Sequence, residues 1–208
     1  MTDRDRPLRV LGVDPGLTRC GIGVVQGPPA RPDLVAALCV RTSPDEDVSR
    51  RLLAVHDGIA EAIEVHRPDA VAVERVLFSV NVRTAMATGQ AAGVALLAAA
   101  RAGLPVTPYS PTEVKASVAG YGAADKDAVG RMVAAQLRLD APPTPADVAD
   151  ALAVALTHLS RARLVAASGP SSATAALADA VAASRRPGPA GGWAAVLDNP
   201  NLREVGGA

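Results

Sequence analysis

The chain has 208 residues, a length that suits one domain of medium size or a domain followed by a tail. Apolar residues make up 49% of it but aromatic residues only 2%, so its core has to be built from Ala, Val and Leu. The 21 basic and 21 acidic residues cancel, and two scattered cysteines make neither a disulfide framework nor a zinc site. The start lacks the apolar stretch of a secretory signal, and the longest apolar run is too short to span a bilayer. We therefore expect a cytoplasmic protein that does not enter a membrane.

The first forty residues predict three short strands. Arg9–Val13 is rich in β-formers and ends in the turn signal Asp-Pro-Gly at 14–16. Apolar runs resume at Cys20–Gln26 and at Leu34–Val40. Because only short turns separate these runs, we expect an antiparallel meander.

After the third strand, helices and strands alternate. Apolar residues at helical spacing predict a helix over Val48–His66, and the continuously apolar run Ala70–Val73 is typical of a central strand covered on both faces. A long Ala-rich helix, a short strand and three further helices are expected at Arg83–Ala102, Pro105–Tyr109, Pro111–Val118, Lys126–Leu137 and Pro145–Arg163.

This order predicts an α/β fold with a mixed five-stranded sheet, three antiparallel strands followed by two parallel ones, flanked by helices. It is the order of the ribonuclease-H-like fold and not of a doubly wound parallel sheet. We assign this domain to residues 1–165. Over residues 166–208, Ala, Gly, Ser and Pro dominate, a composition that favours a flexible C-terminal tail.

Four acidic residues are candidates for a catalytic site. Asp14 and Glu74 each follow directly on a predicted strand, whereas Asp147 and Asp150 lie three residues apart, on one face of a predicted helix. Taken singly, Asp14 can cap a turn, and Glu74 can pair with Arg75 on the surface. Capping does not explain Asp150, which borders an almost wholly apolar segment and needs a cation or a nearby arginine.

Asp147 is the most ambiguous of the four. Thr144 and Pro145 before it are typical of a helix N-cap followed by proline at the first helical position, so Asp147 can serve the helix alone. Together, however, the acids favour a metal site. Mg²⁺ takes oxygen ligands, and two ions about 4 Å apart can clamp the attacking and leaving oxygens of a phosphodiester. The sequence therefore predicts magnesium-dependent cutting of a phosphodiester bond.

Seven short segments between about Leu8 and Ser160 match one known family together and in order: Gly12–Gly21, Val73–Val76, Asn81–Thr84, Gly89–Ala91, Pro111–Lys115, Ala124–Lys126 and Ala146–Ala153. This set resembles the RuvC-type Holliday-junction resolvases. The resemblance implies a homodimer that resolves four-way DNA junctions in recombination and repair by paired symmetric nicks, leaving 5′-phosphates. It also implies Mg²⁺ as cofactor, two ions per active site with Mn²⁺ as a substitute, and the RuvA–RuvB branch-migration complex as a partner.

The resemblance also assigns roles to ten residues of this chain. The catalytic metal ligands are Asp14, Glu74, Asp147 and Asp150. The DNA contacts are Lys115, Lys126, Arg75, Arg83, Leu77 and Phe78. Lys115 and Lys126 can also be read as two solvated helix residues. Leu77 stands where many members carry a phenylalanine wedge, and Phe78 follows one position later.

Charge and small residues add two further predictions. From Arg75 to Arg138, seven basic and three acidic residues leave a local excess of +4, which predicts salt-sensitive DNA binding. Gly89 and Gly93 lie four residues apart on the Ala-rich helix, where they permit close packing on the sheet or on a partner subunit. We expect one helix face on each.

Three other functions remain open from the sequence. A YqgF-like nuclease shares the Asp-Pro-Gly opening but does not account for the later acids and lysines. An actin-like or sugar-kinase ATP-binding protein shares the Asp-x-Gly loop but needs a second lobe, for which 208 residues leave no room. A junction-binding protein without catalysis is disfavoured by the presence of all four acids.

Overall fold

The computed structural model describes residues 7–75 and 82–168, with the side chains of 82, 83 and 163–168 left undescribed. In chain order, the elements are β1 (Arg9–Asp14), β2 (Arg19–Gln26), β3 (Asp33–Arg41), α1 (Val48–His66), β4 (Ala70–Glu74), α2 (Val82–Arg101), β5 (Val106–Tyr109), α3 (Pro111–Ala119), α4 (Lys126–Leu137) and α5 (Ala146–Ser168).

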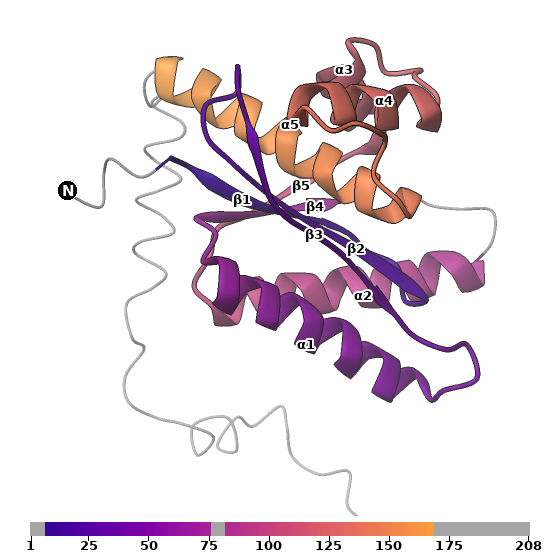
Figure 1. The fold of residues 1–208 in the computed structure, drawn as a ribbon. Coiled ribbons are helices and arrows are strands. Elements are labelled where there is room, and N and C mark those ends of the chain that lie inside the picture. The colour runs from indigo at the N-terminus through magenta and orange to yellow at the C-terminus, as the bar shows by residue number, and fades with distance from the viewer. Residues whose placement is uncertain (1–6, 76–81, 169–208) are drawn as a thin grey trace, which may run out of the picture. The chain divides into compact units, whose positions relative to one another are not determined.

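The strands form one sheet in the order β3-β2-β1-β4-β5. β1 and β3 pair antiparallel with β2, whereas β4 pairs parallel with both β1 and β5. The predicted mixed sheet, with three antiparallel strands followed by two parallel ones, is therefore confirmed (Figure 1).

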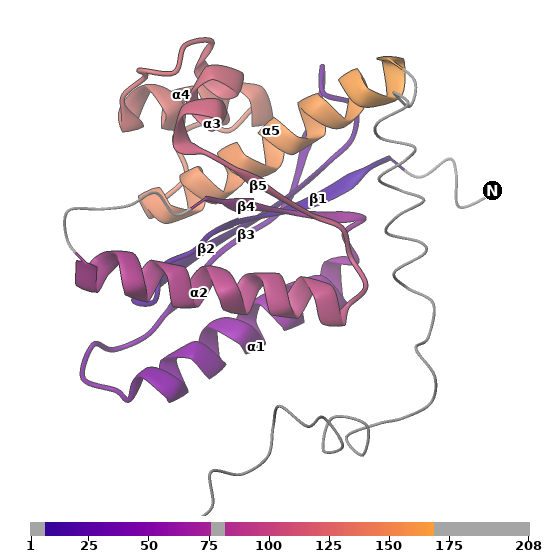
Figure 2. The ribbon, with the colours of Figure 1, turned by 180° about the vertical axis from the view of Figure 1, so that it is seen from behind.

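Helices cover both faces of this sheet. α1 and α2 lie on one face, and α3, α4 and α5 lie on the other (Figures 1 and 2). Alternate residues of β1 enter two separate cores: Leu11 and Val13 belong to the core with α1 and α2, whereas Val10 belongs to the core with α5. This alternation follows from the two-residue period of a strand and explains why the central strands are continuously apolar.

Three glycines of β1 and β2 allow α5 to lie directly on the sheet. A Cβ atom on Gly12 would overlap the carbonyl oxygen of Ala151, and one on Gly21 would overlap that of Asp147. A Cβ atom on Gly23 would lie 2.7 Å from the Leu152 side chain. The backbone of α5 can approach this closely only because these positions lack side chains, and this contact places the first turn of α5 beside the end of β1.

Some element boundaries differ from those predicted. β1 includes Asp14, so this residue ends a strand instead of opening a turn. α5 begins at Ala146, so Pro145 precedes the helix and the predicted N-cap at Thr144 is wrong. α5 also extends to Ser168, because its apolar pattern continues beyond Arg163. The chain divides into two units, 1–164 and 165–208, and the nature of the second stays a prediction.

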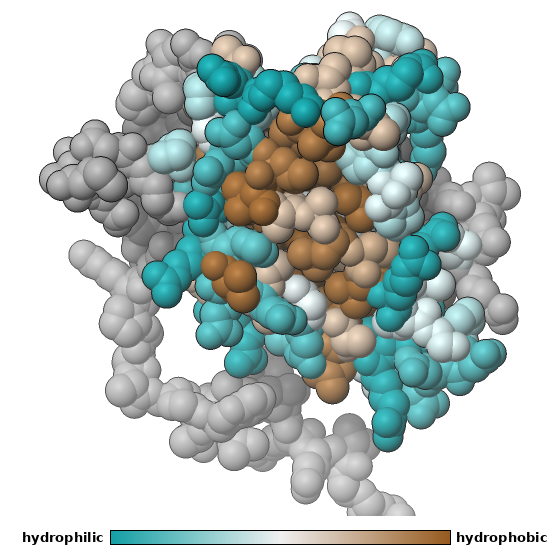
Figure 3. All heavy atoms as spheres, viewed as in Figure 1, coloured by the Kyte–Doolittle hydropathy of each residue, from teal (hydrophilic) through white to brown (hydrophobic). Residues whose placement is uncertain are grey.

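The edge strand β3 is only partly covered. Apolar side chains gather over this part of the sheet, within a polar rim (Figure 3). A groove of about 260 Å³ between β3 and α1 is lined by Leu38, Val40 and Val65 among others. None of the helices described is long and apolar enough to cross a membrane.

Candidate active site

The pairing of β1 with β4 brings two of the predicted acids together. Val13 and Val73 are register partners in this parallel pair, so Asp14 and Glu74 follow side by side at the carboxyl ends of the two strands. Gly12 faces α5, and Asp14 therefore points to the same face two residues later. Both acids thus lie beneath the first turns of α5.

Asp14, Glu74 and Asp150 line one pocket of about 310 Å³. Lys115 from α3 and Lys126 from α4 line it as well. The wall is completed by Pro111, Val114 and Val129. Three predicted metal ligands and the chain's only two lysines therefore meet in one place, although they lie far apart in the sequence.

Helix caps fix where the lysines stand. Ser110 follows β5 directly and forms a capping box with Glu113, so α3 begins at the sheet end. Asp125 caps α4 by accepting a hydrogen bond of 2.6 Å from the Ala128 backbone N–H. Lys126 is therefore the first residue of α4, and its Nζ donates to Asp150 Oδ2 at 3.0 Å.

Burial and like charge act together on the acids at the sheet end. Burial raises the pKa of Asp14 to about 8, and the negative charges of Glu74, Asp150 and Asp147 add to this shift. The pKa of Glu74 rises to about 7, through burial first and Asp150 second. Lys126 opposes both shifts. A bound cation would stabilise the charged forms in the same way, but more strongly.

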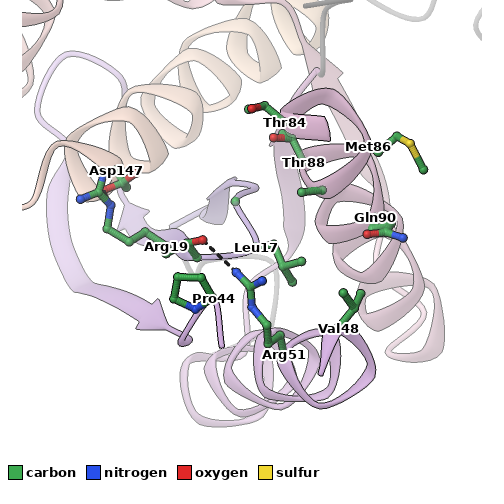
Figure 4. A pocket seen from close by; sticks show the side chains of 13 residues that line it. Leu17, Arg19, Pro44, Val48, Arg51, Thr84, Met86, Thr88, Gln90 and Asp147 are labelled. Atoms are coloured by element: carbon green, nitrogen blue, oxygen red, sulfur yellow. Dashed lines mark hydrogen bonds and ion pairs between the residues drawn. The ribbon is translucent and has the colours of Figure 1, made fainter. Parts of the chain in front are cut away.

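Asp147 lies apart from the other three acids. Its carboxylate forms an ion pair with Nε of Arg19 at 3.0 Å, and both residues line a second, larger pocket of about 1070 Å³ (Figure 4). Asp147 and Asp150 are three residues apart on α5, which is about one helical turn. The two pockets therefore follow one another along the helix, each with one of these acids.

The donor set fits magnesium in its chemistry. Asp14, Glu74 and Asp150 supply carboxylate oxygens to one pocket, which are the ligands that Mg²⁺ prefers. Within residues 7–75 and 82–168, no group of three or more His, Cys, Asp or Glu side chains is already arranged about one point. Lys126 and Arg19 lie 3.0 Å from Asp150 and Asp147, so an ion would have to displace these contacts.

The remaining predicted DNA contacts are less defined by the structure. Arg75 is exposed beyond β4, and its backbone N–H donates to the Tyr109 carbonyl. Arg75 does not line the pocket of the three acids. Leu77, Phe78 and the side chain of Arg83 lie outside the described residues.

Two arginines near the site were not anticipated from the sequence. Arg19 pairs with Asp147, and Arg51 of α1 lies nearly buried beside the turn between β1 and β2. Neither carries a local signal, because each contacts residues brought close only by folding. By contrast, the capping box at 110–113 has a local signal, Ser-x-x-Glu, from which the start of α3 could have been predicted.

Residues 10–158 match the model of the family described as crossover junction endodeoxyribonuclease RuvC. The chain belongs to this family. A RuvC protein of Salinispora arenicola is 56% identical over 77% of this chain and 94% of its own length. One of Paenarthrobacter aurescens is 55% identical over 86% of this chain and 98% of its own.

A solved RuvC structure supports the fold. The Thermus thermophilus RuvC, solved in complex with a Holliday junction substrate, superposes with a TM-score of 0.72 at 41% identity. The match covers 76% of this chain and 96% of that protein. The ribonuclease-H-like fold and the RuvC resemblance are therefore both confirmed. Family membership also separates the chain from the YqgF-like and kinase alternatives.

Proposed function

We propose that this chain is a crossover junction endodeoxyribonuclease that resolves four-way DNA junctions by paired, symmetric nicks, leaving 5′-phosphate ends. One observation carries the proposal in a chain of the RuvC family. Asp14, Glu74 and Asp150 meet Lys115 and Lys126 in one pocket at the carboxyl end of the sheet. This arrangement suits metal-assisted attack on a phosphodiester.

The four acids are assigned to the metal, and the pocket is the place where it would bind. Asp14, Glu74 and Asp150 line the pocket, and Asp147 lies one helical turn before Asp150. Bound Mg²⁺ activates water and neutralises charge on the phosphate. We assign two Mg²⁺ ions per site, with Mn²⁺ as a substitute, because four carboxylates and two phosphate oxygens suffice for two ions that keep several waters.

The lysines are assigned to the DNA backbone. Lys126 neutralises Asp150 at 3.0 Å, and its side chain is 74% exposed, so it can turn to a phosphate without unfolding its helix. Lys115 lies across the same pocket and lowers the pKa of Glu74. We also assign Arg75 and Arg83 to the DNA backbone, and Leu77 or Phe78 to the junction bases.

The outer face of α2 is proposed as the homodimer surface. A Cβ atom on Gly89 or Gly93 would meet nothing within 4 Å, so these two glycines do not serve close packing on the sheet. Met86 and Leu97 are 62% and 54% exposed, and these four residues follow one helical stripe. A second copy on this stripe would give two active sites related by a two-fold axis, as paired nicks require.

Two further assignments follow from the proposed activity. We propose that the protein acts in the cytoplasm, where bacterial recombination and DNA repair take place. We also propose that it works with the RuvA–RuvB branch-migration complex, which would move the junction to a position where it can be cut.

The decisive experiment incubates the protein with a synthetic four-way junction, with Mg²⁺ or with EDTA. Symmetric nicks that require the metal support the proposal. Junction binding without nicks under every divalent ion tried would instead identify a binding protein without catalysis. Asp14→Asn is expected to abolish cutting and to retain junction binding, because it removes one ligand charge and leaves the basic surface intact.

A further inference from the structure

Apart from Asp147, which is assigned to the metal, and Met86, which is assigned to the dimer surface, the residues that line the larger pocket have no role in the function proposed so far. This pocket lies between the β1–β2 turn and the N-terminal turns of α1, α2 and α5 (Figure 4). Its volume of about 1070 Å³ lies just above the usual range for ligand sites, which is roughly 300–1,000 Å³. The charged residues that line it are Arg19, Arg51 and Asp147. Their formal charges leave one net positive charge facing the pocket.

Arg51 carries that uncompensated charge. Its relative exposure is only 8%, and its guanidinium donates to Thr42 Oγ1 at 2.9 Å and to Thr18 Oγ1 at 2.8 Å. These hydroxyls satisfy donors but bring no negative charge. No carboxylate of the described residues forms an ion pair with Arg51, whereas Arg19 has Asp147. A buried cation without a counter-charge is costly unless a ligand supplies one.

The pocket also adjoins the catalytic site. Asp14 lines the smaller pocket and Gly16, two residues later, lines the larger one. Along α5, Asp150 lines the smaller pocket and Asp147, three residues earlier, lines the larger one. A polymer with regularly spaced negative charges that passes through the smaller pocket would therefore reach the larger one within one or two of its repeats.

We propose that Arg51 binds a backbone phosphate of the DNA strand that is cut, one or two nucleotides from the scissile phosphate. The inference rests on the proposed nuclease function. Thr18 and Thr42 hold the guanidinium in place, which leaves its remaining donors for phosphate oxygens. Arg19 strengthens the positive potential whenever Asp147 is neutralised by another cation.

The test is a double-mutant cycle on binding to a four-way junction in EDTA. One change is Arg51→Gln, and the other replaces single phosphates near the cut site by neutral methylphosphonates. Arg51→Gln is expected to weaken binding roughly tenfold and to lower the salt slope by about one, as for one lost phosphate contact. At one methylphosphonate position, the combined loss of binding free energy must be smaller than the sum of the losses from Arg51→Gln and from the methylphosphonate alone. Arg51→Lys keeps the charge and is expected to retain most of the slope.

A second pair of variants covers the case in which Arg51→Gln does not fold. Val48 lines the same pocket and is 46% exposed, so Val48→Glu and Val48→Lys change the pocket charge without disturbing the core. Opposite effects on junction affinity, weaker for Glu and stronger for Lys, support the site. Equal affinities in both variants would overturn it.

Two other outcomes would also overturn the assignment. Additive losses of binding free energy at every phosphate tested would mean that Arg51 has only a structural role, through its hydrogen bonds to Thr18 and Thr42. Thermal stabilisation of the wild type by a deoxynucleoside monophosphate, lost in Arg51→Gln and without coupling to any DNA phosphate, would point to a free nucleotide. Because wild-type cutting is measured separately, a failure of the nuclease proposal would be recognised as such.

Discussion

Asp14 is a residue at which the needs of folding and of function oppose each other. It ends a central strand and lies under α5, and the negative charges of Glu74, Asp150 and Asp147 repel its own. Its pKa is consequently raised to about 8. Such a carboxylate destabilises the folded chain unless a cation is near, which is the usual compromise at a metal site.

The pH dependence of stability should report this compromise. Because the folded pKa of Asp14 lies above its unfolded value, the folded state holds the proton more tightly between about pH 4 and pH 8. We expect the free energy of unfolding in EDTA to fall as the pH rises through this window. At pH 8, Asp14→Asn should be more stable than the wild type, by on the order of 2 kcal/mol. Urea unfolding at pH 5 and pH 8 measures both, and added Mg²⁺ should narrow the gap.

Lys126 should compete with the metal for Asp150. Its ammonium lies 3.0 Å from Asp150, and this hydrogen bond raises the pKa of Lys126. Lys126→Gln is expected to bind Mn²⁺ up to about fivefold more tightly, since an exposed ion pair contributes at most about 1 kcal/mol. The same variant should cut DNA more slowly. Titration calorimetry without DNA measures the affinity, and Lys115→Gln is the matched control. Weaker Mn²⁺ binding by Lys126→Gln would contradict the competition.

At the scale of elements, the site depends on how α5 meets the sheet. The three glycines at 12, 21 and 23 form a flat surface on β1 and β2. On that surface, the helix backbone can approach closely enough for Asp150 to share a pocket with Asp14. A helix held away by ordinary side chains would place its carboxylates too far from the strand ends.

Gly21→Ala tests this contact. Its Cβ would overlap the Asp147 backbone, so we expect a loss of about 1–3 kcal/mol in stability together with weaker metal binding. Gly130→Ala on α4 is the matched control. A Cβ there meets only Pro142 Cβ, at an ordinary contact distance of 3.5 Å, and alanine in a helix gains up to about 1 kcal/mol over glycine. Equal melting temperatures for the two variants would refute the close packing of α5.

The exposed stripe of α2 gives a separate prediction about self-association. Leu97→Glu places a charge on the proposed dimer surface, and we expect a monomer with unchanged melting temperature at low concentration. Leu53→Glu on α1, at a similarly exposed leucine, should remain dimeric. Sedimentation over a range of concentrations distinguishes the two. A monomeric wild type would contradict the assignment of the stripe.

At the scale of the whole molecule, the described fold contains every acid assigned to the site. All of them lie between Asp14 and Asp150, and α5 extends to Ser168. The family match likewise ends at residue 158. The role of the residues that follow the helix is therefore open to a direct test.

A chain of residues 1–168 is expected to keep its melting temperature within a few degrees and to keep metal-dependent cutting. This expectation follows from the composition of residues 169–208, in which Ala, Gly, Ser and Pro dominate, as is typical of a flexible tail. Thermal unfolding and the junction assay measure the two quantities. A loss of cutting at unchanged stability would show that 169–208 contribute to DNA or partner binding, and a loss of stability would show that they pack on the domain.

Much of this fold could be predicted from local patterns. Apolar runs and helical spacing located every described strand and helix, and short connections after Val13 and Gln26 predicted the antiparallel meander. Local patterns also placed Asp14 and Glu74 at strand ends, since an acid directly after an apolar run is visible in the sequence. The start of α5 was misplaced because proline is compatible with a first helical turn but does not require one.

The sequence by itself determined the element order and the family, and it predicted that four acids belong to one site. Only the tertiary structure decided how these acids are distributed between two pockets. Asp150 shares a pocket with Asp14 and faces Lys126, whereas Asp147 turns to Arg19 and a second pocket. Spacing along a helix defines which side chains are neighbours, but not which charges the rest of the fold brings to them. Those charges come from residues 24 and 128 positions away, whose approach depends on the packing of α5 against the glycines of the sheet.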